Sequence, residues 1–325
     1  MDKLLLMRAP VEKDLEQFSV LFDQVLTSSN PLLQKVLDHV RQRKGKMMRP
    51  MLVMLIARLL GELNERTFHS ALSLELLHTA SLIHDDVVDE SAERRGMPSV
   101  NAVFHNKVAV LSGDFVLASS LAEASQTGSQ TIISLISKLG RDLSDGELLQ
   151  LYNISNQEVS EEVYFDIIRK KTAALFSVSA AVAACSVGVE QEKVDFAARL
   201  GELIGICFQI RDDIFDYFPS AQIGKPTGND MREGKLTLPA IYAYHKAAGN
   251  ERVRDLVRRI KASEATAEDI QEMIEFSVES GGIEYARCRM KELGQEARDL
   301  LGSYPESPVR RALEAYIDYV AERTT

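Results

Sequence analysis

Apolar residues recur at the spacing of an α-helix along most of the chain. In one representative stretch they step by one, three or four positions, at Phe196, Leu200, Leu203, Ile204, Cys207 and Phe208. No proline interrupts the chain between Pro98 and Pro219, and no stretch alternates apolar and polar residues between turn signals. The pattern predicts an all-α protein.

No linker divides this helical pattern. The chain has no low-complexity segment, and Asn30-Pro31 and Arg49-Pro50 fit helix starts or loops, because proline fixes φ and lacks an N–H. From Glu251 onward the chain is more charged, which is typical of amphipathic helices with a solvated face. We therefore predict one helical domain over residues 1–325.

The most apolar run, from Thr172 to Val189, approaches the length of a membrane span. It is rich in Ala and Ser and follows three basic residues directly, so a buried core helix is the better interpretation. The first residues, MDKLLLMRAP, bring charges at once and lack the long apolar core of a signal peptide. We expect a cytoplasmic protein without a transmembrane segment.

Composition narrows the choice of partners. The 325 residues include 38 Lys and Arg against 48 Asp and Glu, a net charge of -10 at pH 7, and such an acidic chain argues against a nucleic-acid surface. Cys185, Cys207 and Cys288 are scattered through apolar, helical contexts without CxxC spacing. They are predicted to be reduced, packed thiols.

Two acidic motifs repeat within the chain. HDDVVD at 84–89 recurs as RDDIFD at 211–216, each after a long apolar helix. Asp85 and Asp89 are four residues apart, as are Asp212 and Asp216, so each pair projects from one face of its helix. Like charges at this spacing destabilise a helix by roughly 0.2–0.5 kcal/mol. Some other interaction must therefore offset the repulsion.

A hard divalent cation would offset it. Mg²⁺ prefers oxygen ligands, uses one or two carboxylates, and completes its shell with water and substrate phosphates. A single DDxxD is explained equally well by a solvated helix end, but two copies favour metal binding, and neither has the spacing of an EF-hand. Two such clusters facing each other would hold several ions around one polyphosphate.

Basic residues lie close in sequence to these acids. They are Lys46 and Arg49 in GKMMRP, Arg94 and Arg95 in ERRG, Lys171 in RKKT, and Lys225 and Lys235 in GKPTGNDMREGK. A surface salt bridge would explain any one of them. Together they suggest groups that bind phosphate, because Arg in particular suits bidentate contact with phosphate oxygens.

The combined motifs resemble those of the trans-polyprenyl diphosphate synthases. The resemblance rests on LELLHTASLIHDDVVDESAERRGMPSVN, SGDF, KKTAALF, GICFQIRDDIFDY and IGKPTGNDMREGKLTLP, and it spans the chain roughly from Lys44 to Pro239. It implies a single large bundle of antiparallel helices around a deep central cavity, in a homodimer. It also implies a prenyltransferase that joins isopentenyl diphosphate head to tail onto an allylic diphosphate, using three Mg²⁺ ions.

The resemblance assigns roles to individual residues. Mg²⁺ would be bound most directly by Asp85, Asp89 and Asp212, with further or water-mediated contacts from Asp86, Asp213 and Asp216. Isopentenyl diphosphate would be held by Lys46, Arg49, His78 and Arg95, and the allylic diphosphate by Arg94, Lys171, Lys225 and Lys235. The reacting region would be lined by Thr172 and Gln209. The family often has two glycines before the first lysine, where this chain has Lys44-Gly45-Lys46.

Two small residues, Ala80 and Ser81, stand about one turn before Asp85. Small residues also admit a neighbouring helix, so packing alone is one interpretation. Short-chain members of the family tend to carry aromatic residues at these positions. The resemblance therefore favours an open apolar tunnel and a long product of about the octaprenyl class, although residues on other helices would form the tunnel floor.

Other functions stay open. A shorter-chain synthase, making farnesyl or geranylgeranyl diphosphate, is the main alternative. A class I terpene cyclase would normally replace the second motif with a different metal site, and a non-catalytic regulatory subunit usually lacks acids from a motif, yet both motifs are intact here. The sequence does not determine whether a lipid product would draw the protein to a membrane surface.

Overall fold

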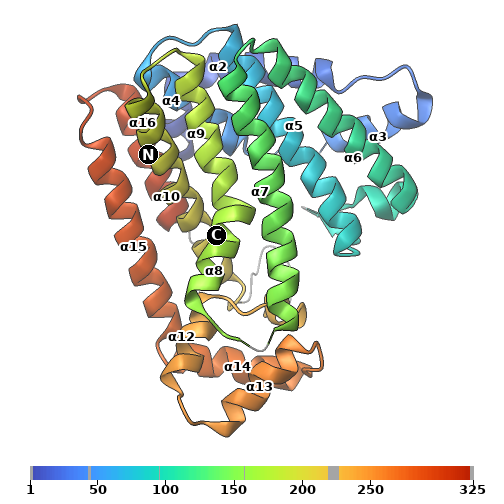
Figure 1. Cartoon of the computed structure of the whole chain (residues 1–325), viewed down its shortest axis with the longest axis vertical. Helices are drawn as coiled ribbons and strands as arrows, with labels where there is room; N and C mark the ends of the chain where they lie inside the picture. Colours follow the sequence, from blue (N-terminus) through green and yellow to red (C-terminus); the bar gives the residue numbers. More distant parts are fainter. Residues whose placement is uncertain (1–2, 43–44, 95, 157, 219–226, 323–325) are drawn as a thin grey trace. The chain divides into compact units, whose positions relative to one another are not determined.

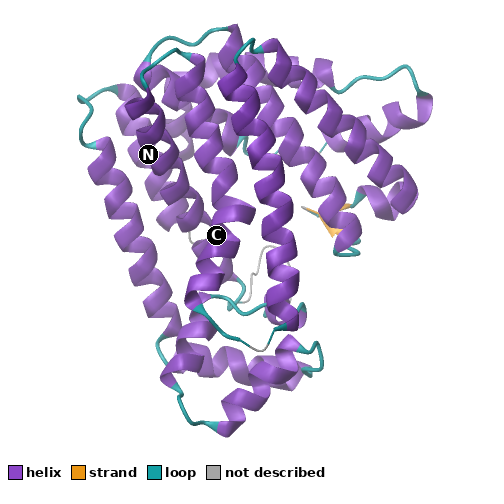
Figure 2. Cartoon of the chain, viewed as in Figure 1, coloured by secondary structure: helices purple, strands orange, loops and turns teal. Residues whose placement is uncertain are grey.

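The computed structural model describes residues 3–42, 45–94, 96–156, 158–218 and 227–322, most of which are helical (Figures 1 and 2). The all-α prediction is confirmed. The chain separates into two compact units, whose boundaries fall inside helices except the one between Ser303 and Tyr304, which lies between α15 and α16. The first unit comprises Met1–Gly140, Leu175–Gly201 and Tyr304–Tyr316, and the second comprises Arg141–Ala174, Glu202–Ser303 and Ile317–Thr325. The assignment of residues 1–325 to one domain stays a prediction.

The first unit is built from N-terminal helices and parts of later ones. Its complete elements are α1 (Lys3–Arg8), the 3₁₀ helix η1 (Ala9–Val11), α2 (Glu12–Val25), α3 (Pro31–Arg41), α4 (Met48–Leu60), α5 (Glu65–Val88), β1 (Glu93–Arg94), β2 (Met97–Pro98) and α6 (Val100–Gln126). Parts of α7 (Gln130–Ser155), α9 (Ala174–Ser186), α10 (Gln191–Phe215) and α16 (Pro308–Glu322) also belong to it.

The second unit takes the remaining parts of those four helices. Its complete elements are α8 (Glu161–Ile168), the π-helix η2 (Arg169–Ala173), α11 (Asn229–Arg232), α12 (Leu238–Lys246), α13 (Glu251–Lys261), α14 (Ala267–Glu279) and α15 (Gly282–Leu301). The run at 172–189 contains the end of η2 and the mostly buried α9, which confirms the prediction of a core helix. The π-helical turn before α9 was not predicted.

Polar side chains determine where several helices begin. The Asn30 side chain accepts hydrogen bonds from the first amides of α3, whose first residue is Pro31, as the Asn-Pro pair predicted. Asn64 and Thr67 form a capping box at the start of α5. Between α5 and α6, β1 and β2 form an antiparallel pair of two residues each. The prediction of no strand is wrong in this detail, because two residues are too few to show alternation.

The core of the first unit joins α5 to α6. Its cluster of buried apolar side chains contains Leu26, Val36, Leu37, Leu76, Ala80, Ile83, Val100, Ala109 and Val116. The two helices approach closely at Gly113, where an added Cβ would lie 2.2 Å from Nε2 of His84. A larger residue at this crossing would require the partly exposed His84 ring to move. Of the described helices, α6 has the length and mean hydropathy that would let it cross a membrane, a test that core helices also pass.

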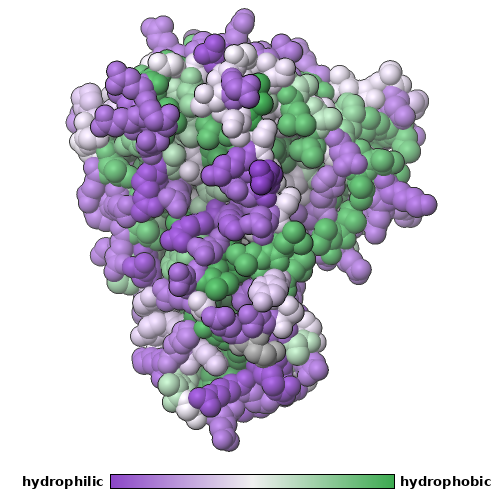
Figure 3. All heavy atoms as spheres, in the orientation of Figure 1, coloured by the Kyte–Doolittle hydropathy of each residue, from purple (hydrophilic) through white to green (hydrophobic). Residues whose placement is uncertain are grey.

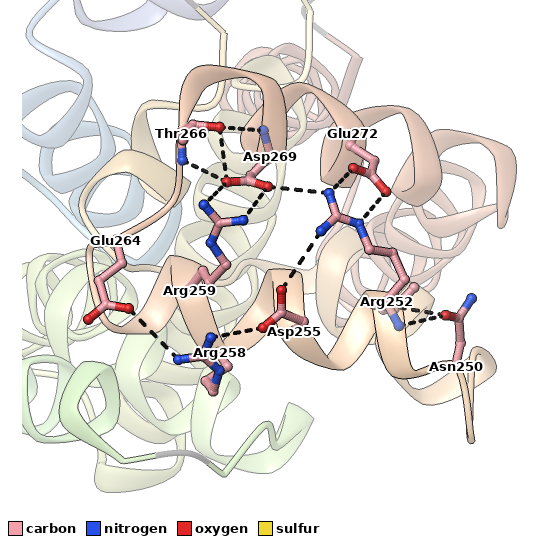
Figure 4. Close-up of polar contacts among 10 residues, drawn as sticks. Asn250, Arg252, Asp255, Arg258, Arg259, Glu264, Thr266, Asp269 and Glu272 are labelled. Carbon is pink, nitrogen blue, oxygen red and sulfur yellow. Dashed lines mark hydrogen bonds and ion pairs between the residues drawn. The ribbon is translucent and has the colours of Figure 1, made fainter.

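In the second unit, an ion-pair network joins α13 to α14 (Figure 4). The buried carboxylate of Asp269 accepts hydrogen bonds from the Thr266 amide at 2.8 Å, from Arg259 at 2.9 Å and from Arg252 at 3.3 Å. The Thr266 hydrogen bonds and the two arginines hold the pKa of Asp269 below its usual value. Ile270, on the same helix, lies against Gly228, so this hairpin supports the start of α11.

The cysteines are all free, as predicted. Cys207 is buried, and burial raises the pKa of its thiol to about 12. Cys185 is partly buried. Cys288 is exposed on α15, so the prediction that all three thiols are packed is wrong for this residue. Arg287 and Arg289 flank it in the sequence, and this charged context is the signal that it lies on the solvent side of an amphipathic helix.

Candidate active site

The first acidic motif stands at the C-terminal end of α5. Asp85 is partly buried, Asp86 is 1% exposed, and Asp89 is exposed as the C-cap residue, with its amide 2.8 Å from the Asp85 carbonyl oxygen. Successive residues of a helix point about 100° apart, so Asp86 turns inward where Asp85 does not. The three acids are therefore not equivalent.

Arg94 meets the inward-facing acid. Its Nε donates to Oδ1 of Asp86 at 2.6 Å, and Figure 2 shows the strand pair that carries Arg94 beside the end of α5. The side chain of Asn101 donates to the Asp86 carbonyl oxygen at 3.0 Å and so ties α6 to the same turn. Arg95, predicted to contact substrate, lies outside the described residues.

Asp86 and Arg94 also line a cavity of about 80 Å³ in the first unit. His78 lies in the same wall, together with Glu75, whereas Phe18, Phe22, Val40, Leu82 and Ile83 make much of the remaining lining apolar. Of the predicted residues, the structure thus brings together His78, Asp86 and Arg94. Glu75 was missed, although it stands in the quoted LELLHTA stretch.

The other predicted residues of the first unit lie outside this lining. Lys46 is exposed just before α4, and Arg49 lies in the first turn of α4, with its guanidinium 5.1 Å from the ring centre of Phe176. Ala80 is buried in the core cluster, and Ser81 is partly buried, with its hydroxyl donating to the His78 carbonyl oxygen at 2.9 Å.

The second acidic motif ends α10 in the second unit. Asp212 is held by its neighbour: the buried Arg211 donates to its Oδ1 at 2.8 Å and also to the Val320 carbonyl oxygen at 3.0 Å. Asp213 turns inward and is buried, as Asp86 is in the first motif. It accepts hydrogen bonds from the Tyr164 hydroxyl at 2.6 Å and from Nε2 of Gln209 at 2.7 Å.

The third acid of this motif, Asp216, anchors the next helix. Its Oδ1 accepts from the Asn229 amide at 3.0 Å, and its Oδ2 accepts from the Asp230 amide at 3.0 Å. Its carbonyl oxygen accepts from the Gly228 amide at 2.8 Å. Gly228 has a φ of 74°, and an added Cβ would lie 2.6 Å from Ile270, so glycine is required there. Asp216 thereby fixes the backbone that carries Asp230.

A cavity of about 130 Å³ in the second unit gathers most of the remaining predicted residues. Its lining includes Lys171, Thr172, Gln209, Asp213 and Lys235. Lys225, the other predicted diphosphate ligand in this part of the sequence, lies outside the described residues, and Asp212 and Asp216 do not line the cavity. Two acids and a tyrosine near these residues were missed.

The missed residues are Tyr164, Glu147 and Asp230. Tyr164 and Asp230 line the cavity, and Glu147 places Oε2 2.5 Å from Nζ of Lys171. Burial and, secondly, repulsion from Asp216 raise the pKa of Asp230 to about 6. Burial, followed by the negative charge of Asp230, raises the pKa of Asp213. Asp230 could have been found in GKPTGNDMREGK, but nothing in the sequence marked Tyr164.

Carboxylate oxygens are the donor type that a hard divalent cation takes. In the described part of the chain no three His, Cys, Asp or Glu side chains converge closely enough to hold a metal by themselves. Each acidic motif can therefore supply only one or two ligands to an ion, Asp85 and Asp89 from the first motif and Asp212 from the second. Water or phosphate oxygens would have to complete the coordination shell. The cavity in the second unit combines this acidic surrounding with Lys171 and Lys235, which suits a metal-bound phosphate.

Known proteins are similar to this chain in sequence and fold. The sequence model of the polyprenyl synthetase family matches residues 30–276. An octaprenyl diphosphate synthase from Haemophilus influenzae is 37% identical over 89% of this chain and 87% of its own length. A geranylgeranyl pyrophosphate synthase structure from Bacteroides thetaiotaomicron is 51% identical with a TM-score of 0.87, covering 99% of this chain and 100% of that one. A decaprenyl diphosphate synthase structure from Rhodobacter capsulatus is 35% identical with a TM-score of 0.91, covering 98% of each chain.

The anchoring role of Asp216 predicts a local change in backbone protection. Replacing Asp216 with Ala removes two acceptors from the start of α11, each worth about 1 kcal/mol as a helix cap. The amides of Asn229 and Asp230 should then exchange with deuterium several-fold faster in peptide-resolved exchange. Asp195→Ala is the control, because Asp195 is an exposed acid on α10 that accepts a hydrogen bond from the Gln191 side chain. Unchanged exchange at Asn229 and Asp230 would contradict the anchoring role.

Proposed function

The chain belongs to the polyprenyl synthetase family, and from that premise we propose that it joins isopentenyl diphosphate head to tail onto an allylic diphosphate to give a long-chain, all-trans polyprenyl diphosphate. The observation that supports this most directly is the cavity in the second unit. Five residues that the resemblance to the family assigned to the site line this cavity together. They are Lys171, Thr172, Gln209, Asp213 and Lys235.

The family implies the use of a divalent metal, and we propose Mg²⁺, about three ions per site by resemblance. Asp85, Asp89 and Asp212 are the proposed direct ligands, because each is at least partly accessible. Asp86, Asp213 and Asp216 would be further or water-mediated ligands, because each already has partners in the protein. Asp86 contacts Arg94, Asp213 contacts Tyr164 and Gln209, and Asp216 contacts two backbone amides. When bound, Mg²⁺ would neutralise charge that accumulates on the leaving diphosphate.

The chain's own residues supply the rest of the proposed mechanism. Lys171 and Lys235, with Arg94 and Lys225, would hold the allylic diphosphate while its C–O bond breaks and the electron pair leaves with the diphosphate. Lys46, Arg49, His78 and Arg95 would orient isopentenyl diphosphate. Its double bond would attack the allylic carbon, and it would then lose a proton to the departing diphosphate. Exclusion of water from the apolar parts of the cavities would protect the cation.

The length of the product is the finer part of the proposal. Octaprenyl and decaprenyl synthases among the similar proteins support a long chain, whereas the 51% identical protein is named a geranylgeranyl pyrophosphate synthase and supports a shorter one. Ala80 and Ser81 favour the longer product, because they leave out the aromatic groups that tend to close the tunnel in short-chain members. Each additional buried CH₂ group contributes about 0.8 kcal/mol, so a dry tunnel would reward elongation.

The activity is tested with the purified chain, Mg²⁺, isopentenyl diphosphate and an allylic primer. We expect diphosphate release and a polyprenyl diphosphate product in mass spectrometry. Asp85→Asn and Asp212→Asn should each lower kcat at least about 100-fold, because each would weaken stabilisation of charge on the leaving group. Asp299→Asn, an exposed acid on α15, is the matched control.

Three outcomes would contradict this proposal. Hydrocarbon released from farnesyl diphosphate alone would indicate a cyclase, and no diphosphate release from the wild-type chain with both substrates would indicate a non-catalytic subunit. Full activity after removal of divalent metal with EDTA would reject the role of Mg²⁺.

Ser81 gives the sharper test of product length. Ala80 is 1% exposed within the core cluster, so a phenylalanine there would also overpack the core by about 1–3 kcal/mol. Ser81→Phe, alone and with Ala80→Phe, should shorten the longest product by several isoprene units in a chromatogram. Ser119→Phe replaces a partly buried serine with a similar hydroxyl-to-carbonyl bond on α6 and serves as control. An unchanged product from Ser81→Phe would contradict the tunnel assignment.

We also propose that the chain forms a homodimer through the exposed face of α6. Val110 and Leu121 lie along one side of this helix with Leu111 nearby, Val103 precedes the kink at His105, and the four are 40% to 68% exposed. Figure 3 shows hydrophobic surface over α6 on the face that it displays. Such an apolar stripe is typical of a subunit interface.

The homodimer is tested by analytical ultracentrifugation at micromolar concentration. The wild-type chain should sediment as a dimer, and Leu111→Glu combined with Leu121→Glu should shift it to a monomer by placing charge in the apolar contact. Leu32→Glu alters a leucine that is 51% exposed on α3 and should leave the dimer intact. A monomeric wild-type chain would reject the proposal.

A further inference from the structure

A chain of hydrogen bonds crosses the wall of the cavity in the second unit. The Tyr164 hydroxyl, on α8, donates to Oδ2 of Asp213, on α10, at 2.6 Å. Nε2 of Gln209, one turn earlier on α10, donates to Oδ1 of the same carboxylate at 2.7 Å. The Thr172 hydroxyl, on η2, donates to Oε1 of Gln209 at 2.6 Å. All four residues line the cavity.

The direction of these bonds follows from what each group can donate. The Asp213 carboxyl group accepts at both of its oxygens, so a donor must face each of them. Gln209 meets this demand with its amide nitrogen, which leaves its carbonyl oxygen facing Thr172. Thr172 has a single hydroxyl hydrogen, and that hydrogen is directed to Gln209. The lone pairs of the Thr172 oxygen are therefore left available to the cavity.

Tyr164 occupies the far end of this chain. Its side chain is 5% exposed, and its ring packs edge-on against Phe165 with ring centres 5.3 Å apart. The hydroxyl is therefore held at a fixed place by the packing of α8. A rigid donor at one end of a buried network limits the orientations open to all of its members.

Resting on the proposed function, we infer that Tyr164 is a positioning residue for prenyl transfer. It holds Asp213, Asp213 orients the amide of Gln209, and Gln209 aims the hydroxyl oxygen of Thr172 toward the cavity. An oxygen lone pair so directed stabilises the positive charge that develops on the allylic carbon as the C–O bond breaks. Without Tyr164, the amide of Gln209 can turn over and the Thr172 hydroxyl can rotate.

The same helix offers a matched control. The Tyr285 hydroxyl donates to both carboxylate oxygens of Glu161, the first residue of α8, at 2.8 and 3.0 Å. Neither residue lines the cavity. Tyr164→Phe and Tyr285→Phe thus remove the same hydroxyl-to-carboxylate bond from α8, one inside the cavity wall and one away from it.

Steady-state kinetics of the full chain with Mg²⁺, isopentenyl diphosphate and an allylic diphosphate separate the two roles. Tyr164→Phe should lower kcat about 10- to 100-fold, the size of effect expected from misplaced reacting groups, with KM for the allylic diphosphate within about twofold of wild type. Tyr285→Phe should leave kcat within about twofold. Tyr164→Met, which also lacks the hydroxyl, gives the same test should the Phe variant fail to fold.

A double-mutant cycle tests whether Tyr164 acts through Thr172. Thr172→Val removes the hydroxyl that ends the chain of hydrogen bonds, so Tyr164→Phe should lower kcat no more than about twofold in that background. Fully multiplicative effects of the two substitutions would overturn the inference. So would a Tyr164→Phe variant with the kcat of Tyr285→Phe, or one that changes KM alone. An inactive wild-type chain would instead overturn the proposed function, and this inference with it.

Discussion

A carboxylate that is withdrawn from water must be supplied with hydrogen-bond donors. This constraint shapes the C-terminal ends of α5 and α10, the two helices that carry the acidic motifs. Asp86 in the first unit and Asp213 in the second are almost fully buried. An unsatisfied buried charge would cost several kcal/mol, so each needs partners of its own. Arg94 meets the need of Asp86, and Tyr164 with Gln209 meets that of Asp213.

This demand explains why the acids come in adjacent pairs. Neighbouring residues of a helix point about 100° apart, so one acid of each pair faces inward and fastens the helix end, while the other is left accessible. The fastening groups come from separate elements, β1 in one unit and α8 in the other, so the accessible acids Asp85 and Asp212 stand on ends that cannot fray freely. A repeated DD therefore combines a structural group with an accessible one, which is the acid proposed to bind metal.

The sequence predicted the features that depend on local pattern. Helical spacing predicted α10, and the Asn30-Pro31 pair predicted the start of α3. The two lysines of the second unit's cavity and Asp213 followed from motif resemblance, whereas Asp230 was missed. Tyr164 could not be predicted, because its role depends on the packing of α8 against α10, which no spacing within α8 encodes. The strand pair at Glu93–Arg94 and Met97–Pro98 was equally invisible, since it is stabilised by contacts of Arg94 rather than by alternation.

The charges around the second unit's cavity explain why the proposed diphosphate site would use a metal. Lys171 and Lys235 are accompanied by Asp230, and Lys171 already pairs with Glu147 at 2.5 Å, whereas burial raises the pKa of Asp213 and disfavours its charge. With a pKa of about 6, Asp230 is mostly ionised at neutral pH. Among the described residues of this cavity, the acids thus offset the lysines, and the protein alone offers a diphosphate little net attraction. Under the proposed function a divalent cation would reverse that balance, so that carboxylates and lysines could share one diphosphate site.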